Sequence, residues 1–199
     1  MKKVAIGICL VISVLLIPGT GSADVNFVLE INPLSYIISP DIDGFKTTNG
    51  VVFEELDGYG SLFPTLKAGI GFGSDRHMID LLGGVGYLWN DGFSAKTYSA
   101  DAFFRFKVDQ RGIFTVGPHI GVIRFNPEWD GPSKIDLADE TGWVVGVGFT
   151  VGSPKVAFSA ALDYLSAEFD VTPQAGWTAN ENTLDISGFL IQLGVQFRF

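Results

Sequence analysis

Large apolar residues and small or polar residues alternate along most of this chain, with the period of two that a β-strand imposes. The segment 188–199 shows the pattern best. Alternate positions from Phe189 to Phe199 are all large and apolar, whereas only Leu190 is large and apolar among the positions between them. The alternation therefore predicts eight strands, of which the earlier seven cover 26–32, 62–72, 79–89, 98–107, 114–122, 143–151 and 156–164.

The connections between these segments alternate in length. Short polar turns at 74–76, 109–112 and 152–155 are separated by longer connections. Strands joined in this way are antiparallel neighbours. Eight such strands can close into a barrel with tight turns at one end and long loops at the other. We expect loops in the longer connections, at 33–61, 90–95, 126–140 and 166–185.

The volumes of the side chains indicate which face of the predicted barrel points outward. Glycine recurs on the polar face of the strands, for example at Gly69, Gly71, Gly146 and Gly148. The lumen of an eight-stranded barrel is only just wide enough for its own side chains, so the glycine-rich face fits inside. A soluble barrel such as a lipocalin has the opposite arrangement. The pattern therefore predicts an all-β, eight-stranded antiparallel transmembrane barrel with short periplasmic turns and long extracellular loops.

Charged residues on the glycine-rich face are balanced in sign, although the chain has a net charge of −9. An unpaired buried charge costs several kcal/mol, so this balance suits a lumen closed by paired charges. The excess of acidic residues lies in the long connections. The predicted lumen network contains Glu30, Asp80, Asp101 and Asp163, the cations Lys67, Arg105, Lys107 and Arg198, and the polar residue His119.

Aromatic residues cluster near both ends of the predicted strands, as at Trp89 and Trp143 on the long-loop side and Phe106 on the short-turn side. The apolar band of the last strand spans roughly 25 Å along a membrane normal when the strand is tilted by about 40°. Two aromatic girdles at this separation are typical of barrels in the outer membrane. We therefore expect an outer-membrane location.

The first residues are typical of a secretory signal peptide. Lys2 and Lys3 precede an apolar run from Val4 to Ile17, and small residues ending at Ala23 suit a cleavage site. The apolar run is shorter than the ~20 residues that a membrane-spanning helix needs. We expect residues 1–23 to be removed and residues 24–199 to form the barrel domain.

In these features the chain resembles the small OmpA- and OmpX-type outer-membrane barrels of the Gram-negative envelope. The resemblance covers the architecture of residues 24–199, and its most specific element is the last strand, ending Gly-Val-Gln-Phe-Arg-Phe. It implies that Phe197 and Phe199 are an assembly signal read by the barrel-assembly machinery, with periplasmic chaperones as earlier partners. It also implies contact with outer-membrane lipid and lipopolysaccharide.

Candidate chemistry is sparse. An acidic chain with a pI near 4.5 is a poor partner for nucleic acid. His119 could act as a base beside Asp101 or Asp163, with Ser99 or Ser159 as nucleophile, but a polar lumen residue is the simpler interpretation. The sequence indicates no cofactor and no metal site.

These observations predict a non-enzymatic, monomeric barrel with an envelope-structural role or a surface-interaction role. Its acidic extracellular loops would contact a ligand, and paired charges would plug its lumen. One alternative is a narrow, porin-like pore or a conduit for small or hydrophobic ligands. A second alternative is a hydrolase that modifies lipid A, with His119 at its centre.

Overall fold

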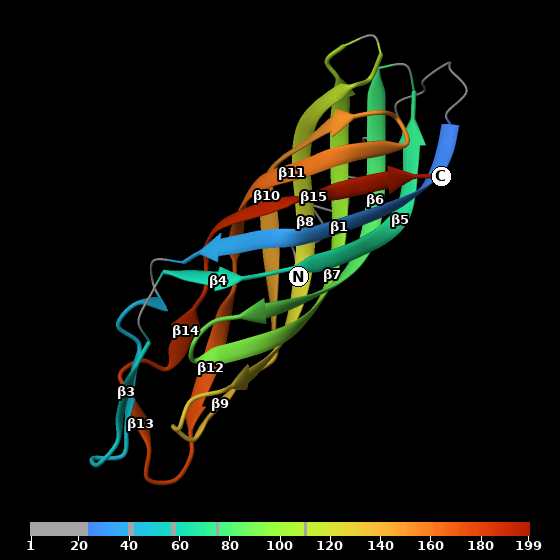
Figure 1. Ribbon diagram of the computed structural model, residues 1–199. Helices are drawn as coiled ribbons and strands as arrows, with labels where there is room; N and C mark the ends of the chain where they lie inside the picture. The colour runs from blue at the N-terminus through green and yellow to red at the C-terminus, as the bar shows by residue number, and fades with distance from the viewer. Residues whose placement is uncertain (1–23, 40–41, 57–58, 75, 110) are drawn as a thin grey trace, which may run out of the picture.

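The computed structural model describes residues 24–39, 42–56, 59–74, 76–109 and 111–199 (Figure 1). The predicted signal peptide lies outside these residues. Within them, long antiparallel strands close into an eight-stranded barrel, which confirms the predicted fold class. No helix in the described ranges is long and apolar enough to cross a bilayer. The eight strands are β1 (Asp24–Ile38), β5 (Thr65–Gly73), β6 (His77–Trp89), β7 (Phe93–Lys107), β8 (Phe114–Trp129), β10 (Glu140–Gly152), β11 (Val156–Ser166) and β15 (Gly188–Arg198).

The barrel closes between its first and last strands. β1 pairs with β15 in register from Val28 opposite Arg198 to Ile38 opposite Phe189. The amide of Phe27 donates to the carbonyl of Phe199 at 3.1 Å, and the reverse bond measures 3.0 Å. Each of the eight strands is thus paired on both sides within the described residues. A lipid environment requires this because it offers no hydrogen-bond partners.

Strand β1 is longer than its alternation indicated. The predicted strand ends at Asn32, but β1 continues to Ile38 after a register shift between Ile31 and Leu34. The exposed apolar residues occupy odd positions before the shift and even positions after it, as at Leu34 and Tyr36. A period-two pattern loses the strand at such a bulge, because the extra residue moves every later side chain to the other face.

The long connections contain short strands, which the sequence analysis did not predict. Gly60–Leu62 forms β4, which pairs with β1 and β6 and prolongs the position of β5 in the barrel wall. The other short strands form two three-stranded sheets, ordered β13-β2-β3 and β14-β12-β9. We call the residues 42–56, 130–139 and 167–187 the outer extension; in Figure 1 it lies at the end of the barrel away from the C-terminus. Its strands are β2 (Lys46–Thr48), β3 (Phe53–Glu55), β9 (Ile135–Leu137), β12 (Glu168–Pro173), β13 (Thr178–Ala179) and β14 (Thr183–Asp185).

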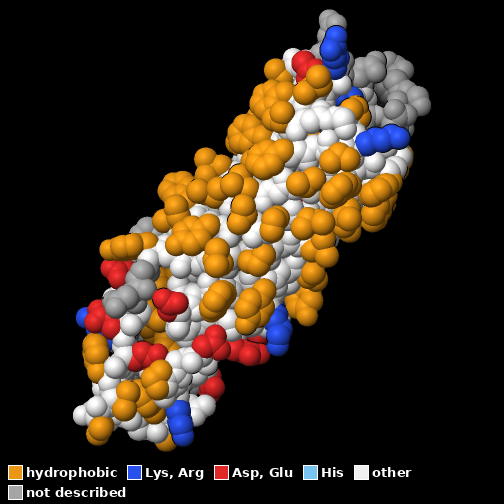
Figure 2. Space-filling view, viewed as in Figure 1, with side chains coloured by type: hydrophobic (Ala, Val, Ile, Leu, Met, Phe, Trp, Pro, Cys, Tyr) orange, Lys and Arg blue, Asp and Glu red, His pale blue; other side chains and the backbone are white. Residues whose placement is uncertain are grey.

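The outer wall of the barrel is apolar, as the alternation predicts. Figure 2 shows hydrophobic side chains covering the wall, while Asp and Glu gather at the end formed by the outer extension. Trp89, Tyr98 and Trp143 are exposed on the side of the extension, and Phe106 and Phe199 are exposed near the short turns. The protein is therefore built with bulky apolar groups facing lipid.

Candidate functional site in the barrel interior

The half of the lumen nearer the short turns is organised around a buried carboxylate, Asp80 of β6. Arg198 of β15 donates through Nη2 to its Oδ1 at 2.8 Å and its Oδ2 at 2.6 Å, and Arg105 of β7 bonds it through Nη1. Glu30 lies 3.7 Å from Nη2 of Arg105 and accepts from Nε2 of Gln196 at 2.9 Å. Four strands thus place charged side chains against one another away from water.

A second cluster lies deeper, around His119 of β8. Its Nε2 lies 3.0 Å from Oδ1 of Asp101, and its Nδ1 lies 2.8 Å from Oδ1 of Asp163. Asp101 also contacts Nζ of Lys67 at 3.2 Å and accepts from Oγ of Ser99 at 2.7 Å. The imidazole is fully buried, so its charge state must agree with these neighbours.

The two carboxylates indicate which form of His119 fits. Each ring nitrogen faces an oxygen that can only accept a hydrogen bond when ionised, whereas a neutral imidazole carries a single N–H. The doubly protonated ring satisfies both oxygens. His119 then joins Lys67, Arg105 and Arg198 as a fourth cation, which matches the four buried acids in number.

Lys107 does not occupy the place that the sequence suggested. Its Nζ donates to the backbone carbonyl of Ser74 at 2.6 Å at the short-turn mouth. Among the described residues, no carboxylate lies within ion-pair distance of Lys107. The alternation along a strand predicts that a side chain faces the lumen, but it does not predict how deep in the lumen the side chain lies. Lys107 is the last residue of β7 and therefore lies at the opening.

Phe103 is a buried residue of the interior that the sequence analysis did not single out. Its ring stacks on His119 with the planes parallel and the centroids 3.9 Å apart. The guanidinium carbon of Arg105 lies 4.2 Å from the same ring centroid, and Nζ of Lys67 lies 5.7 Å from it. These are cation–π distances, so the ring links the two charged clusters.

The arrangement does not support a hydrolase centred on His119. Ser99 donates to Asp101, and Ser159 donates to the side-chain oxygen of Asn32 at 3.4 Å. Both ring nitrogens of His119 are occupied by carboxylates, so neither can take a proton from a serine. The described interior therefore lacks the pairing of nucleophile and base that such chemistry requires.

A large apolar cluster fills the half of the lumen nearer the outer extension, which the sequence analysis did not predict. Phe169 of β12 lies between two barrel residues, with ring centroids 6.0 Å from Phe93 and 5.7 Å from Phe125. Phe63 also stacks on Phe125, with the ring centroids 6.4 Å apart. One buried cluster joins wall and extension, including Ile37, Leu88, Ile123, Val144, Leu165 and Leu190 with Ile42, Phe45, Leu56, Ile135, Val171, Leu184 and Ile186.

The sequence pattern that indicates this apolar half lies beyond Val122, where the predicted strand 114–122 ends. On β8 the inner positions change from His119 and Gly121 to Ile123 and Phe125, and the outer positions change from Val122 to Arg124. Following the alternation past Val122 with its polarity reversed would have found it.

The terminal aromatic residues lie at the closing seam. Phe197 is half-buried on β15, and Phe199 is exposed with its ring centroid 6.2 Å from that of Phe27. Their role as an assembly signal stays a prediction.

Comparison with known proteins supports the fold. No protein-family model and no curated protein matches the chain. Solved structures that match are OprG from Pseudomonas aeruginosa (13% identity, TM-score 0.50, 90% of this chain and 98% of that one) and Neisserial surface protein A (12%, 0.53, 90% and 100%). The outer membrane protein AlkL also matches (18%, 0.50, 92% and 93%). The chain has the fold of eight-stranded outer-membrane barrels.

Proposed function

We propose that this outer-membrane barrel is a closed envelope protein that displays a rigid acidic module at the cell surface for interaction with a cationic partner. The observation that carries the proposal is the continuous apolar core that joins the lumen to the outer extension. The solved structures that share this fold are outer-membrane barrels, which supports this location.

Closure follows from two layers in series. A solute entering from the extension would meet the packed rings of Phe93, Phe125 and Phe169. Below them it would meet the ion pairs around His119 and Asp80, whose side chains are fully buried. Protein interiors packed in this way contain few voids larger than a water molecule, which supports a lumen closed to ions.

The outer extension is held together by contacts between segments far apart in the sequence. Glu54 accepts a hydrogen bond from the backbone amide of Ser133 at 3.2 Å, and Thr47 contacts the hydroxyl of Ser133. Asn180 donates to the carbonyl of Gly44 at 3.1 Å. A surface that is ordered before binding loses less conformational entropy when a partner docks, which favours an interaction role.

The charge of the extension favours a cationic partner. Exposed acids lie on all three of its segments, for example at Glu55, Asp136, Glu168, Asp170 and Glu181. Complementary charge accelerates encounter and selects partners by the sign of their surface. The extracellular ligand that we propose is therefore a basic protein or peptide.

The outer wall just beyond the aromatic residues on the side of the outer extension carries cations that suit binding of lipopolysaccharide. Lys96 lies opposite Tyr87, and Arg124 lies opposite Tyr98, with both cations exposed. Cations at the level of the head groups can bind the phosphates of lipopolysaccharide. We further propose outer-membrane lipid, the barrel-assembly machinery and periplasmic chaperones as partners, and a monomeric state.

Planar-bilayer recording tests closure. Purified mature protein, shown to be folded by its heat-modifiable migration in gels, should give no reproducible single-channel conductance. A steady conductance would overturn the closed barrel and favour the pore or conduit.

Binding of an oligolysine probe tests the acidic module. The triple variant Glu168→Gln, Asp170→Asn and Glu181→Gln should bind the probe much more weakly than the wild type at low salt, with the difference shrinking as salt rises. A matched triple variant, Asp91→Asn, Glu128→Gln and Glu140→Gln, removes equal charge outside the outer extension and should retain most of the binding. Equal loss in both would contradict a defined module.

A further inference from the structure

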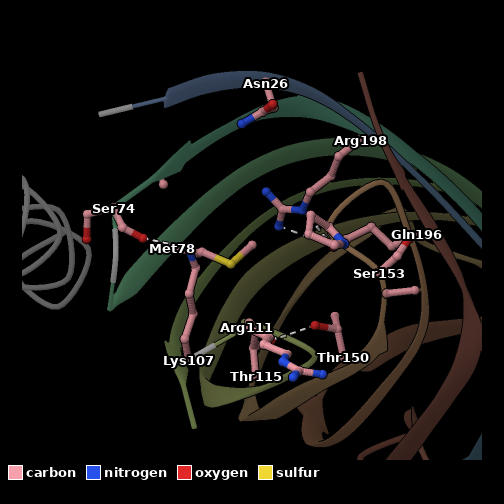
Figure 3. A pocket seen from close by; sticks show the side chains of 14 residues that line it. Asn26, Ser74, Met78, Lys107, Arg111, Thr115, Thr150, Ser153, Gln196 and Arg198 are labelled. Atoms are coloured by element: carbon pink, nitrogen blue, oxygen red, sulfur yellow. Dashed lines mark hydrogen bonds between the residues drawn. The ribbon is translucent and has the colours of Figure 1, made fainter. Parts of the chain in front are cut away.

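A cavity of 230 Å³ opens at the short-turn mouth of the barrel. Its wall combines inward-facing residues of the strands with residues of the turns, and Figure 3 shows Arg198 and Gln196 on one side of the opening and Lys107 and Arg111 on the other. This volume is far larger than one water molecule requires, and somewhat below the roughly 300 Å³ at which drug-sized ligand pockets begin. The cavity therefore suits a small polar solute.

The lining is rich in cations and hydrogen-bond donors. Lys107, Arg111 and Arg198 contribute positive charge, while Thr115 and Thr150 contribute buried hydroxyls that contact each other at 2.6 Å. Among the described residues that line the cavity, none carries a carboxylate. A wall of this composition offers a bound anion both positive charge and hydrogen-bond donors.

The acids closest to this cluster have other partners. Asp109 uses its carboxylate to accept from the backbone amides of Phe114 at 2.8 Å and Arg111 at 3.0 Å. Asp80 lies beneath the cavity and is shared by Arg198 and the fully buried Arg105. The buried network is balanced without Lys107 and Arg111. Among the described side chains, the single carboxylate of the same turn, Asp109, does not offset both of their charges.

We propose that the short-turn mouth is a binding site for the phosphate group of a small soluble anion. Lys107 and Arg111 supply the charge, and Thr150, with its neighbour Thr115, supplies hydroxyl contacts. Guanidinium and ammonium groups are the usual protein partners of phosphate. Because inward-facing residues make up much of the wall, a solute in the periplasm reaches the site more directly than a lipid head group on the outer wall does. The site lies below the charge network, so its occupancy does not depend on closure of the barrel.

Nuclear magnetic resonance titration tests the site. Inorganic phosphate, and glycerol phosphate in parallel, are added at constant ionic strength to the mature protein in maltoside micelles, which contain no phosphate. The amide signals of Thr115, Thr150 and Ser153 should shift in a saturable way, with chloride causing no such change. The variant Lys107→Gln with Arg111→Gln should weaken binding on the order of tenfold or more.

A matched variant separates a built site from general attraction. Arg76→Gln with Lys155→Gln removes the same charge from the same end, but neither residue lines the cavity, so phosphate affinity should change little. Thr150→Val, which keeps every charge, should weaken binding to a smaller extent. Absence of saturable shifts in the wild type, or equal losses in the two double variants, would overturn the proposal.

A second arm distinguishes the source of the phosphate. The titration is repeated in phospholipid nanodiscs, where the same shifts should appear at similar phosphate concentrations. If the shifts appear only in micelles, a lipid head group already fills the site in the bilayer, and the assignment to a soluble anion is wrong.

Discussion

The two halves of the barrel interior have opposite chemistry. Near the short turns the lumen holds paired charges such as Asp80 with Arg105, and near the outer extension it holds packed rings such as Phe93 with Phe169. The outer wall changes in the opposite sense, from Val122 below the girdle to Arg124 above it. Within the bilayer the chain is polar inside and apolar outside, and beyond the bilayer it has the arrangement of a soluble protein.

This reversal follows from the solvent on each side of the wall. In lipid an apolar outer surface is required, and polar groups must find their partners within the protein. Outside the membrane the wall faces water, so burial of apolar groups in the interior stabilises the extension. Strand β8, for example, spans both environments, and its inner and outer faces exchange polar and apolar residues between them.

The largest expected effect comes from breaking the charged half. Asp101→Ala removes the partner of Lys67 and His119 and should lower the free energy of unfolding by about 3–5 kcal/mol, because a buried charge is left without compensation. Denaturant titration of the protein folded in lipid vesicles measures this change. The exposed pair partner Asp139, replaced by Ala, should cost about 1 kcal/mol or less. Equal midpoints for the two variants would contradict the contrast.

The apolar half should respond through packing. Phe169→Ala should destabilise the outer extension by about 3 kcal/mol, because it leaves a cavity between Phe93 and Phe125. Hydrogen exchange should rise in β12 and β14 first. Phe53→Ala, an exposed position on the same extension, is the control and should change exchange little. Uniform loss of protection across the whole barrel after Phe169→Ala would argue against two separable halves.

Charge balance around His119 gives an intermediate effect. His119→Gln leaves two carboxylates facing a neutral group and should cost about 2 kcal/mol. Adding Asp163→Asn restores equal numbers of buried acids and cations, so the double variant should be more stable than additivity predicts. A double-mutant cycle measures this coupling. Strict additivity would show that the imidazole is not the fourth cation.

The smallest effect concerns a turn at the charged end. Backbone hydrogen bonds, first that of Phe114 and then those of Ile113 and Arg111, hold the pKa of Asp109 below its ordinary value. A carboxylate with a depressed pKa contributes stability that is present above its unfolded-state pKa and is lost as the pH falls through its folded-state pKa. Exchange of the Phe114 amide should therefore accelerate in that acidic range, relative to neighbouring turns, and Asp109→Asn should remove the step.

The barrel and the face that points outward could be predicted because alternate residues of every strand lie on the same face. The residues of the lumen network were also found by parity, including His119 and Asp163. The alternation could not show that Lys107 lies at the mouth, or that His119 replaces Lys107 as the fourth cation of the charge network. Both facts depend on how deep each residue lies along the barrel. The bulge after Ile31 was invisible for the related reason that it changes parity itself.

The sequence by itself determined the eight barrel strands, their antiparallel order, the side that faces lipid and the acidic charge of the long connections. These depend on local alternation and on the lengths of turns, which each segment carries independently. Only the tertiary structure decided which acid meets which base, and that Phe169 enters the lumen to join the extension to the barrel. Those contacts join strands distant in the sequence, and their register is set by closure of the whole wall.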